Sequence, residues 1–140
     1  MKKIPFKLYK RIIDLLPILC VDAAVLHKGK YILVKRKNEP VKGGWWVPGG
    51  RVLKGETMEE AVIRKTKEEL GIKVKIIKPL GYFEHYFREN EFGVKSGIHQ
   101  VSIVFLVKPL SLNIKLDEQS GTWEFSKNLP KTFKITPFAD

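Results

Sequence analysis

The stretch from Gly50 to Ile72, GRVLKGETMEEAVIRKTKEELGI, contains the signals that decide the fold. A glycine-containing turn leads into Thr57, a good N-cap residue, and Glu60 three positions later completes a capping box. Gly71 is a typical helix stop. The helix predicted between these signals has one inward-facing stripe, formed by Met58, Ala61, Val62 and Thr66.

Charged side chains gather at the far end of this helix. Lys65, Glu68 and Glu69 have the i, i+3 and i+4 spacing that places side chains on one face. Glu56 lies just ahead of the helix and can reach back to Arg64. One interpretation is a magnesium site, since hard cations take oxygen ligands from carboxylates and backbone carbonyls. The alternative is a solvated acidic helix end with ordinary salt bridges, and the glycine turn with Glu56 and Arg64 in register favours the metal site.

Length and composition indicate one domain over residues 1–140. The chain has a hydrophobic content of 44% and eight Phe, enough for a sizeable core. Its formal net charge of +11 suits an anionic partner such as a nucleotide, a nucleotide sugar or nucleic acid, or else provides a solubilising face. Cys20 is the single cysteine, so an internal disulfide is excluded.

The N-terminal region bears on localisation. Residues 4–16 have a helical spacing of apolar side chains, which predicts an amphipathic helix that Pro17 ends. Arg11 and Asp14 interrupt the apolar region of a signal-like pattern, and Leu19 is too large for the position before a processed cysteine. A membrane span needs about 18 uninterrupted apolar residues, which this run lacks. We therefore expect a cytoplasmic protein without a membrane partner.

Strand patterns surround the predicted helices. Residues 18–26 and 31–36 predict a hairpin, and further strands are predicted over residues 45–47, 74–87, 100–108 and 123–125. The strand over 74–87 is expected to bend at Pro79 and Gly81. Strands around a central helix and a flanking one give a mixed α/β layer fold.

The opening stretch resembles the Nudix box, G-x5-E-x7-R-E-U-x-E-E-x-G-U, where U is a bulky apolar residue. The matching positions are Gly50, Glu56, Arg64, Glu68, Glu69, Gly71 and Ile72. Lys65 stands where the family has a third helix carboxylate, and Thr66 stands where it has an apolar residue. The resemblance implies a Nudix-type α/β/α sandwich with a mixed sheet and a magnesium-dependent hydrolase.

From about residue 18 to residue 129 the chain is similar to the GDP-mannose mannosyl hydrolase branch of that family. The similar segments include Leu33–Pro40, Trp45–Val52 and Glu84–Phe87. The branch also lacks the full set of helix carboxylates, and it cleaves the C–O bond at the anomeric carbon, whereas most Nudix enzymes cleave a P–O bond. Lys65 in place of a carboxylate changes the local charge by about two units and should remove at least one metal.

Metal ligands and a structural pair are implied by the resemblance. The Gly50 carbonyl (or that of Gly49), Glu69 and Gln119 hold one magnesium on the diphosphate. The helix spacing adds Glu68 as a candidate ligand. Glu56 and Arg64 form the structural pair of the box.

Substrate contacts are implied at four other positions. Arg36 and Arg51 meet phosphate or leaving-group oxygens, and Asp22 contacts the nucleoside or sugar side. His85 steadies the departing diphosphate. The alternative for Arg36 is a surface cation at a strand end, and for His85 a strand histidine beside aromatic residues.

The residue that serves as general base in the mannosyl hydrolase branch has no counterpart in this chain. The branch has a histidine directly after its Glu-Gln pair, and Ser120 stands there in this chain. A serine hydroxyl does not accept a proton at neutral pH without help. Either Glu118 or Asp117 takes the base role, or the reaction differs, or turnover is slow. Gln100 is a second departure, because the branch has a tyrosine near the phosphates there.

Three functions follow from these observations. The first is a magnesium-dependent nucleotide-sugar hydrolase, and the second is a pyrophosphohydrolase of a nucleoside diphosphate derivative. The third is a catalytically weak module that binds a nucleotide or RNA, which Lys65, Ser120 and the charge of +11 favour. The intact box residues and Gln119 favour an enzyme. A homodimer is an expectation from the family, with the N-terminal segment as a candidate interface.

Overall fold

Residues 4–37, 43–118 and 120–139 are described by the structure, a computed structural model. In these ranges the elements are, in chain order, α1 (Phe6–Leu15), β1 (Ile18–His27), β2 (Lys30–Arg36), β3 (Trp45–Trp46), β4 (Gly49–Arg51), α2 (Met58–Leu70), β5 (Val74–Phe87), β6 (Ile98–Pro109), β7 (Ser120–Ser126) and β8 (Thr136–Pro137). Neither of the helices found in these ranges has the length and apolar character needed to cross a membrane.

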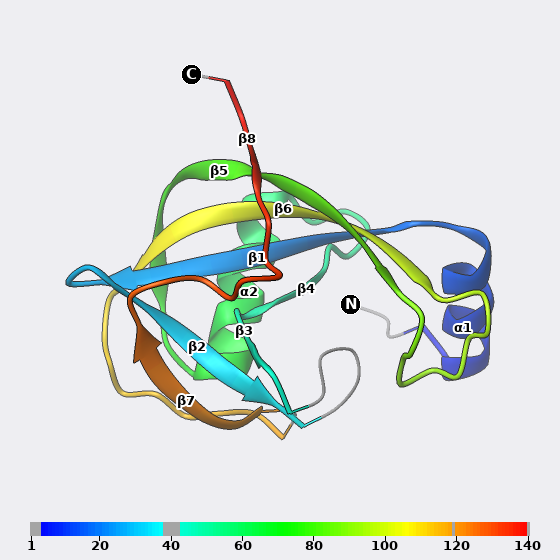
Figure 1. The fold of residues 1–140 in the computed structure, drawn as a ribbon, viewed down its shortest axis with the longest axis horizontal. Coiled ribbons are helices and arrows are strands. Elements are labelled where there is room, and N and C mark those ends of the chain that lie inside the picture. Colours follow the sequence, from blue (N-terminus) through cyan, green and yellow to red (C-terminus); the bar gives the residue numbers. More distant parts are fainter. Residues whose placement is uncertain (1–3, 38–42, 119, 140) are drawn as a thin grey trace.

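The strands form a mixed sheet with the order β3-β2-β1-β6-β5-β8, in which β4 also pairs with β1 and β7 with β2. β1 and β6 are parallel, with Ile18 opposite Gln100, and the other neighbours are antiparallel. Figure 1 shows α2 against the sheet and α1 at one end of the molecule, beside the loop that joins β5 and β6. The predicted mixed α/β fold with a mixed sheet is therefore confirmed.

The strand that pairs with one edge of β1 changes along the length of β1, and this change determines where the glycine-rich stretch lies. β2 is in register with β1 only beside their hairpin turn, where Leu26 faces Tyr31. Nearer the start of β1, the short strand β4 pairs with the same edge, so that Asp22 faces Gly49. The backbone of the glycine-rich stretch is thereby held against β1 at the point where β2 has moved away.

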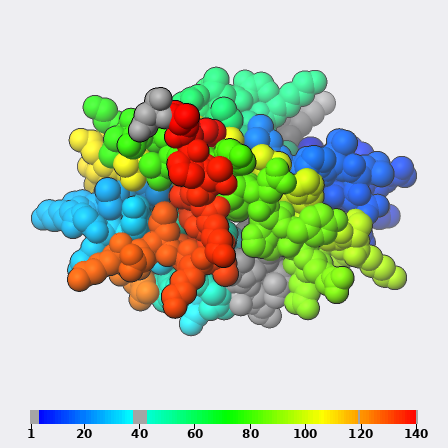
Figure 2. Space-filling model, turned by 45° about the horizontal axis from the view of Figure 1, so that its top comes forward, coloured from blue at the N-terminus to red at the C-terminus, as the bar shows by residue number. Residues whose placement is uncertain are grey.

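Local signals explain several details of the strands. Lys28 and Gly29 both have positive φ, 49° and 77°, as a two-residue hairpin turn between twisted strands requires. β5 changes register between Pro79 and Gly81, which confirms the expected bend. The tail forms β8, a short strand that is absent from the sequence prediction, and its Thr136 pairs with Tyr82 of β5. Figure 2 shows this tail in red, crossing the surface of the molecule.

α2 begins and ends where the sequence predicts. The Glu60 N–H donates to Thr57 Oγ1 at 3.1 Å, and the Thr57 N–H donates to Glu60 Oε1 at 3.2 Å, which completes the capping box. Gly71 ends the helix in the left-handed conformation, with φ 69°. The inward stripe is buried at Ala61, Val62 and Thr66, whereas Met58 is partly buried, so α2 packs its apolar face on the sheet.

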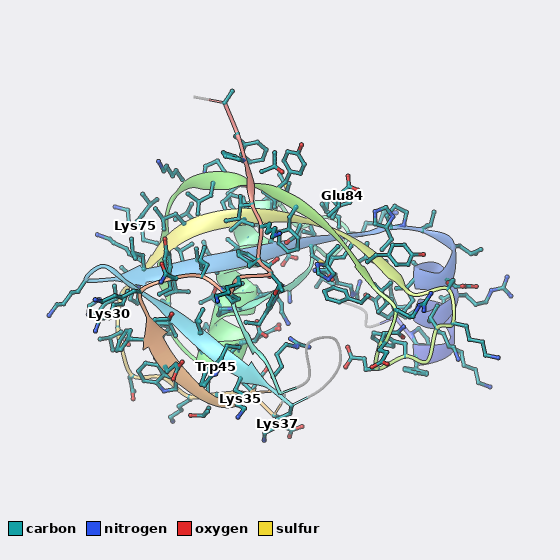
Figure 3. All side chains as sticks on the ribbon, in the orientation of Figure 1. Lys30, Lys35, Lys37, Trp45, Lys75 and Glu84 are labelled. Carbon is teal, nitrogen blue, oxygen red and sulfur yellow. The ribbon has the colours of Figure 1, made fainter. Side chains whose placement is uncertain are left out.

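α1 packs on the β5–β6 end of the molecule rather than on the sheet centre. Ile13 is 3% exposed and belongs to a small apolar cluster with Phe87, Val94 and Ile98. Several lysines elsewhere, including Lys30, Lys35, Lys37 and Lys75, are exposed and point away from the ribbon (Figure 3). The positive charge is thus spread over much of the surface.

Candidate active site

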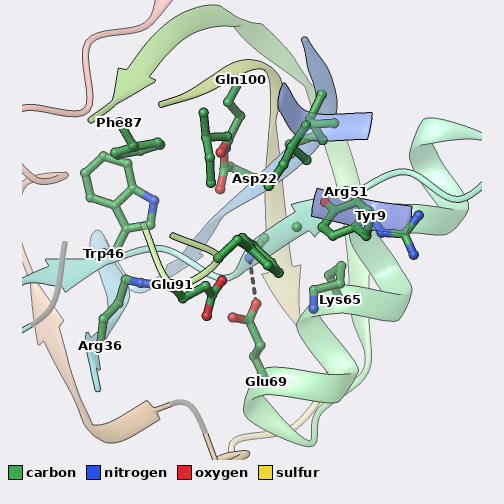
Figure 4. Close-up of a pocket in the computed structure, with 17 residues that line it drawn as sticks. Tyr9, Asp22, Arg36, Trp46, Arg51, Lys65, Glu69, Phe87, Glu91 and Gln100 are labelled. Atoms are coloured by element: carbon green, nitrogen blue, oxygen red, sulfur yellow. Dashed lines mark hydrogen bonds between the residues drawn. The ribbon is translucent and has the colours of Figure 1, made fainter. Parts of the chain in front are cut away.

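A cavity of about 320 Å³ lies between α1, the β5–β6 loop, β1, β4 and the end of α2 (Figure 4). This volume is at the lower end of the range of small-molecule sites. Its charged and amide side chains are Asp22, Arg36, Arg51, Lys65, Glu69, Glu91 and Gln100. Its apolar and aromatic side chains include Tyr9, Ile13, Ile18, Trp46, Phe87, Phe92 and Ile98. Polar groups that converge in a partly apolar cavity are typical of a ligand site.

Two glycines of β4 bring the backbone close to functional side chains. A Cβ at Gly49 would overlap the Asp22 carboxylate, and a Cβ at Gly50 would lie 2.5 Å from Lys65 Cε. Real Cβ atoms do not approach other atoms this closely, so any side chain here would push the neighbours aside. The glycines therefore allow β1, β4 and α2 to meet at one point of the cavity wall.

Glu69 points from α2 into the cavity. It is 5% exposed, and its Oε2 accepts a hydrogen bond from the Gly49 N–H at 2.6 Å. Burial raises the pKa of this carboxyl to about 7, against the opposing effect of the nearby Lys65 ammonium. A bound cation would favour the ionised form of such a group.

Lys65 and Glu68 lie differently from Glu69. Lys65 lines the cavity and donates from Nζ to Glu68 Oε2 at 3.1 Å. The side chain of Glu68 is 49% exposed, also accepts from Arg64 at 3.1 Å, and is not among the described cavity residues. Of the helix carboxylates expected as ligands, Glu69 therefore faces the cavity, and Glu68 is paired with two cations outside it. Its role as a metal ligand stays a prediction.

Glu56 and Arg64 form a tight ion pair that ties the loop before α2 to the helix. Arg64 donates from Nε to Glu56 Oε2 at 2.6 Å and from Nη2 to Glu56 Oε1 at 3.0 Å. The same Nη2 donates to the Arg51 carbonyl at 3.1 Å, and the Leu53 N–H donates to Glu56 at 3.0 Å. Hydrogen bonding from Arg64 holds the pKa of Glu56 below its ordinary value of 4.5. The pair therefore fixes the backbone that carries Arg51.

Arg36 and Arg51 approach the cavity from opposite sides. Arg36 comes from the end of β2, and its positive charge opposes the burial that raises the pKa of Asp22 and of Glu69. The Arg51 guanidinium lies 4.9 Å from the centre of the Tyr9 ring on α1, a cation–π contact. Both arginines are among the described residues that line the cavity, as a phosphate-binding role requires.

Asp22 is a buried carboxyl at the cavity wall. It is 3% exposed, and Ser102 Oγ donates a hydrogen bond to its Oδ2. Burial raises the pKa of Asp22 to about 8, with the Ser102 bond opposing the shift. Gln100, two residues before Ser102 on β6, also lines the cavity. This end of the cavity thus offers a carboxyl and an amide for hydrogen bonding to a polar ligand.

Other predicted residues are not gathered at the cavity. His85 stacks on Phe87 with the ring centres 4.0 Å apart and is not one of the described lining residues. Burial lowers the pKa of His85. Glu118 is exposed and does not line the cavity among the residues described, and Gln119 lies outside the described residues. Ser120 is buried, with its Cα paired to that of Arg36 across β2 and β7.

Sequence reasoning missed Glu91 and the aromatic residues Tyr9, Trp46 and Phe87 as parts of the cavity wall. Glu91 lies in a polar loop without periodicity, which gave no signal of where its side chain points. Tyr9 is not one of the apolar residues whose spacing predicts the N-terminal helix, and only the position of α1 places it at the cavity. Trp46 gave a weak signal, since it lies directly ahead of the glycines of β4.

The donor set can be compared with what magnesium requires. No group of three or more His, Cys, Asp or Glu side chains suited to a metal occurs among the residues described. Magnesium commonly uses one or two carboxylates, keeps several waters and shares the substrate's phosphates. The buried Glu69 carboxylate beside the Gly49–Gly50 backbone fits one such ion, bound together with a diphosphate. It does not fit a cage built from side chains alone.

Comparisons with known proteins identify related sequences and structures. The NUDIX domain family matches residues 18–128. The low-salt glycan biosynthesis protein Agl8 of Haloferax volcanii is 36% identical over 117 residues, covering 84% of this chain and 75% of that protein. The ADP-ribose pyrophosphatase of Methanocaldococcus jannaschii is 37% identical over 132 residues, covering 93% of this chain and 73% of that protein. The crystal structure of a MutT NUDIX hydrolase from Burkholderia pseudomallei has a TM-score of 0.71 at 30% identity, covering 86% of this chain and 91% of that one.

Proposed function

Because the chain belongs to the Nudix hydrolase family, we propose that it hydrolyses a nucleoside diphosphate linked to a sugar. In this proposal the reaction is of the GDP-mannose mannosyl hydrolase type, in which water attacks the anomeric carbon and nucleoside diphosphate and free sugar are released. The size of the cavity, about 320 Å³, and its hydrogen-bonding side chains limit which base and which sugar can bind.

The observation that carries the proposal is the position of Lys65. Its side chain lies against Gly50 inside the cavity, where the family pattern has a carboxylate. Glu68, the neighbouring box carboxylate, is paired with Lys65 and Arg64. A single helix carboxylate, Glu69, therefore faces the cavity among the residues described. Attack at phosphorus profits from several metals, so this arrangement favours attack at carbon.

The cations of the cavity suit a departing diphosphate. In the proposed step a water oxygen forms a bond to the anomeric carbon, and the bond from that carbon to the diphosphate oxygen breaks. The electron pair goes to the diphosphate, whose charge Arg36, Arg51 and Lys65 stabilise from the cavity wall. Glu69 and the Gly50 carbonyl, with Gln119, would hold a magnesium ion, which when bound neutralises diphosphate charge.

The names of two relatives support a sugar-linked diphosphate as the substrate. Agl8 is named for glycan biosynthesis, which suits a sugar-linked substrate. The ADP-ribose pyrophosphatase is named for a nucleoside diphosphate linked to ribose, and its name favours cleavage between the two phosphates. Phosphorus attack on the same substrate class is therefore the second candidate. Nucleic-acid binding and a homodimer stay predictions of the sequence.

Hydrolysis of a nucleotide-sugar panel in ¹⁸O-labelled water tests the proposal. We expect the label in the free sugar and unlabelled nucleoside diphosphate as the second product. Glu69→Gln should remove the magnesium-dependent rate while the thermal unfolding midpoint stays near that of the wild type. Label in a phosphate product would move the assignment to the pyrophosphohydrolase. If no member of the panel gives any product, both the carbon-attack and the phosphorus-attack hydrolase are contradicted. RNA affinity that falls with salt would then favour a binding module.

A further inference from the structure

We propose that Glu91, on the loop between β5 and β6, is the general base that activates the attacking water. The inference rests on the proposed hydrolysis but not on which atom of the substrate the water attacks. It assigns a role to a side chain that the sequence left unassigned. The charged groups that share the cavity with Glu91 are Asp22, Arg36, Arg51, Lys65 and Glu69.

Elimination among the described carboxylates of the cavity leads to Glu91. Glu69 is engaged by the Gly49 N–H, and its neighbourhood is that of a metal ligand. Asp22 is buried and hydrogen-bonded to Ser102. Glu118 and Asp117 are the two candidate bases from the sequence, and neither lines the cavity within the described part of the chain, although the Asp117 N–H donates to the Glu69 carbonyl at 3.3 Å. Glu91 is the remaining carboxylate that lines it.

The position of Glu91 is fixed by its neighbours in the loop. The Asn90 side chain accepts from the Phe92 N–H at 3.1 Å and from the Val94 N–H at 3.0 Å, and it donates to the Val94 carbonyl at 3.0 Å. The Phe92 ring packs edge-on against Tyr9 of α1 with the ring centres 5.2 Å apart. The backbone on either side of Glu91 is thus anchored, which limits the positions that its side chain can reach.

The surroundings of Glu91 suit proton abstraction. Figure 4 shows its carboxylate in the cavity between Arg36 and Glu69, so that it faces the place where a diphosphate would meet the cations. The residue as a whole is exposed, but enough of it is covered that desolvation raises the pKa of the carboxyl, with Arg36 opposing the shift. A carboxylate whose pKa lies nearer the working pH is a stronger base.

The step balances without any further reactant. The Glu91 carboxylate takes one proton from the water, and the water oxygen forms the new bond with its electron pair. The bond to the diphosphate oxygen breaks, and that oxygen keeps the bonding pair. The proton on Glu91 later passes to solvent, which the exposure of the residue permits.

The test compares Glu91→Gln with the control Glu89→Gln on a nucleotide sugar that the wild type hydrolyses. Both glutamates are exposed loop residues, but Glu89 is not among the described lining residues. We expect Glu91→Gln to lower kcat by about 10²–10⁴-fold with little change in KM, and Glu89→Gln to match the wild type. At saturating magnesium, which favours the ionised form of Glu69, the part of the acid-side fall in rate that Glu91 causes should disappear in Glu91→Gln and persist in Glu91→Asp, which keeps a shorter carboxylate.

The outcomes separate this inference from the proposed function. A kcat for Glu91→Gln within about threefold of the wild type would overturn the base assignment and leave the substrate class standing. A loss that high magnesium restores, with a raised half-saturating magnesium concentration, would make Glu91 a metal ligand instead and would also overturn it. The position of the ¹⁸O label reports on the proposed function alone. A wild type inert toward every nucleotide sugar would overturn both.

Discussion

Replacing Arg64 by Met should destabilise the protein strongly, because the change leaves a buried carboxylate without its cation. Glu56 has a side chain that is only 3% exposed and receives two hydrogen bonds from Arg64, at 2.6 and 3.0 Å. After the change it keeps the Leu53 N–H, and the Arg51 carbonyl loses its donor. Removing one partner of a fully buried ion pair costs about 3–5 kcal/mol and exposed pairs contribute about 0–1 kcal/mol, so for this part-buried pair we expect a loss of about 2 kcal/mol.

The ion pair of Arg64 with the half-exposed Glu68 adds little to the expected loss of stability, since exposed pairs contribute about 0–1 kcal/mol. Urea unfolding of Arg64→Met and the wild type measures the difference. Lys67→Met, at an exposed position on the same helix, is the matched control and should change stability by less than about 0.5 kcal/mol. A double-mutant cycle with Glu56→Gln isolates the pair itself. A loss below about 1 kcal/mol for Arg64→Met would refute the view that this pair fixes the loop.

Three further outcomes are expected. Because Arg64 lowers the pKa of Glu56, the stability it confers is fully present above the ordinary carboxyl value of 4.5 and is lost as the pH falls through the lower folded value. Glu56→Gln should therefore flatten the acid limb of stability against pH, and an unchanged limb would contradict this. Lys65→Glu should raise magnesium affinity by about tenfold or more in calorimetry, since two carboxylates then face the cavity; unchanged affinity would mean that Lys65 does not limit metal binding. Gly71→Ala should lower stability by about 1–2 kcal/mol, because φ is 69° and the new Cβ would lie 3.0 Å from the Lys115 carbonyl oxygen; a neutral result in urea unfolding would contradict the strain.

The parts of the fold that depend on local signals could be predicted from the sequence. The limits of α2 depend on Thr57, Glu60 and Gly71, all within or beside the helix, and the structure shows each of them acting as expected. The bend of β5 follows from Pro79 and Gly81 in the same way. β8 could not be predicted, because a two-residue strand has no pattern and exists only through its pairing with β5.

The candidate site was predictable in composition but not in geometry. Spacing alone places Glu68 and Glu69 on neighbouring parts of one helix. Which of them faces the cavity is decided by the Gly49 N–H, which lies 20 residues earlier in the chain and reaches Glu69. Glu91 depends on an even longer link, because its loop is positioned by packing of Phe92 against α1. Contacts of this kind leave no periodic trace in a sequence.

The place of α1 has a consequence for protein engineering. Tyr9 and Ile13 form part of the cavity wall, yet the NUDIX match begins only at residue 18. A fragment that begins at residue 18 would retain α2, the helix of the Nudix box, and lose the part of the cavity wall that α1 forms. Grafting a different helix onto residue 18 would therefore change the cavity wall, and it would also remove the Tyr9 contact that positions the Glu91 loop. The helix outside the family match therefore bears on both the fit of the substrate and the position of the proposed base, so a redesigned enzyme has to keep the Tyr9–Phe92 contact.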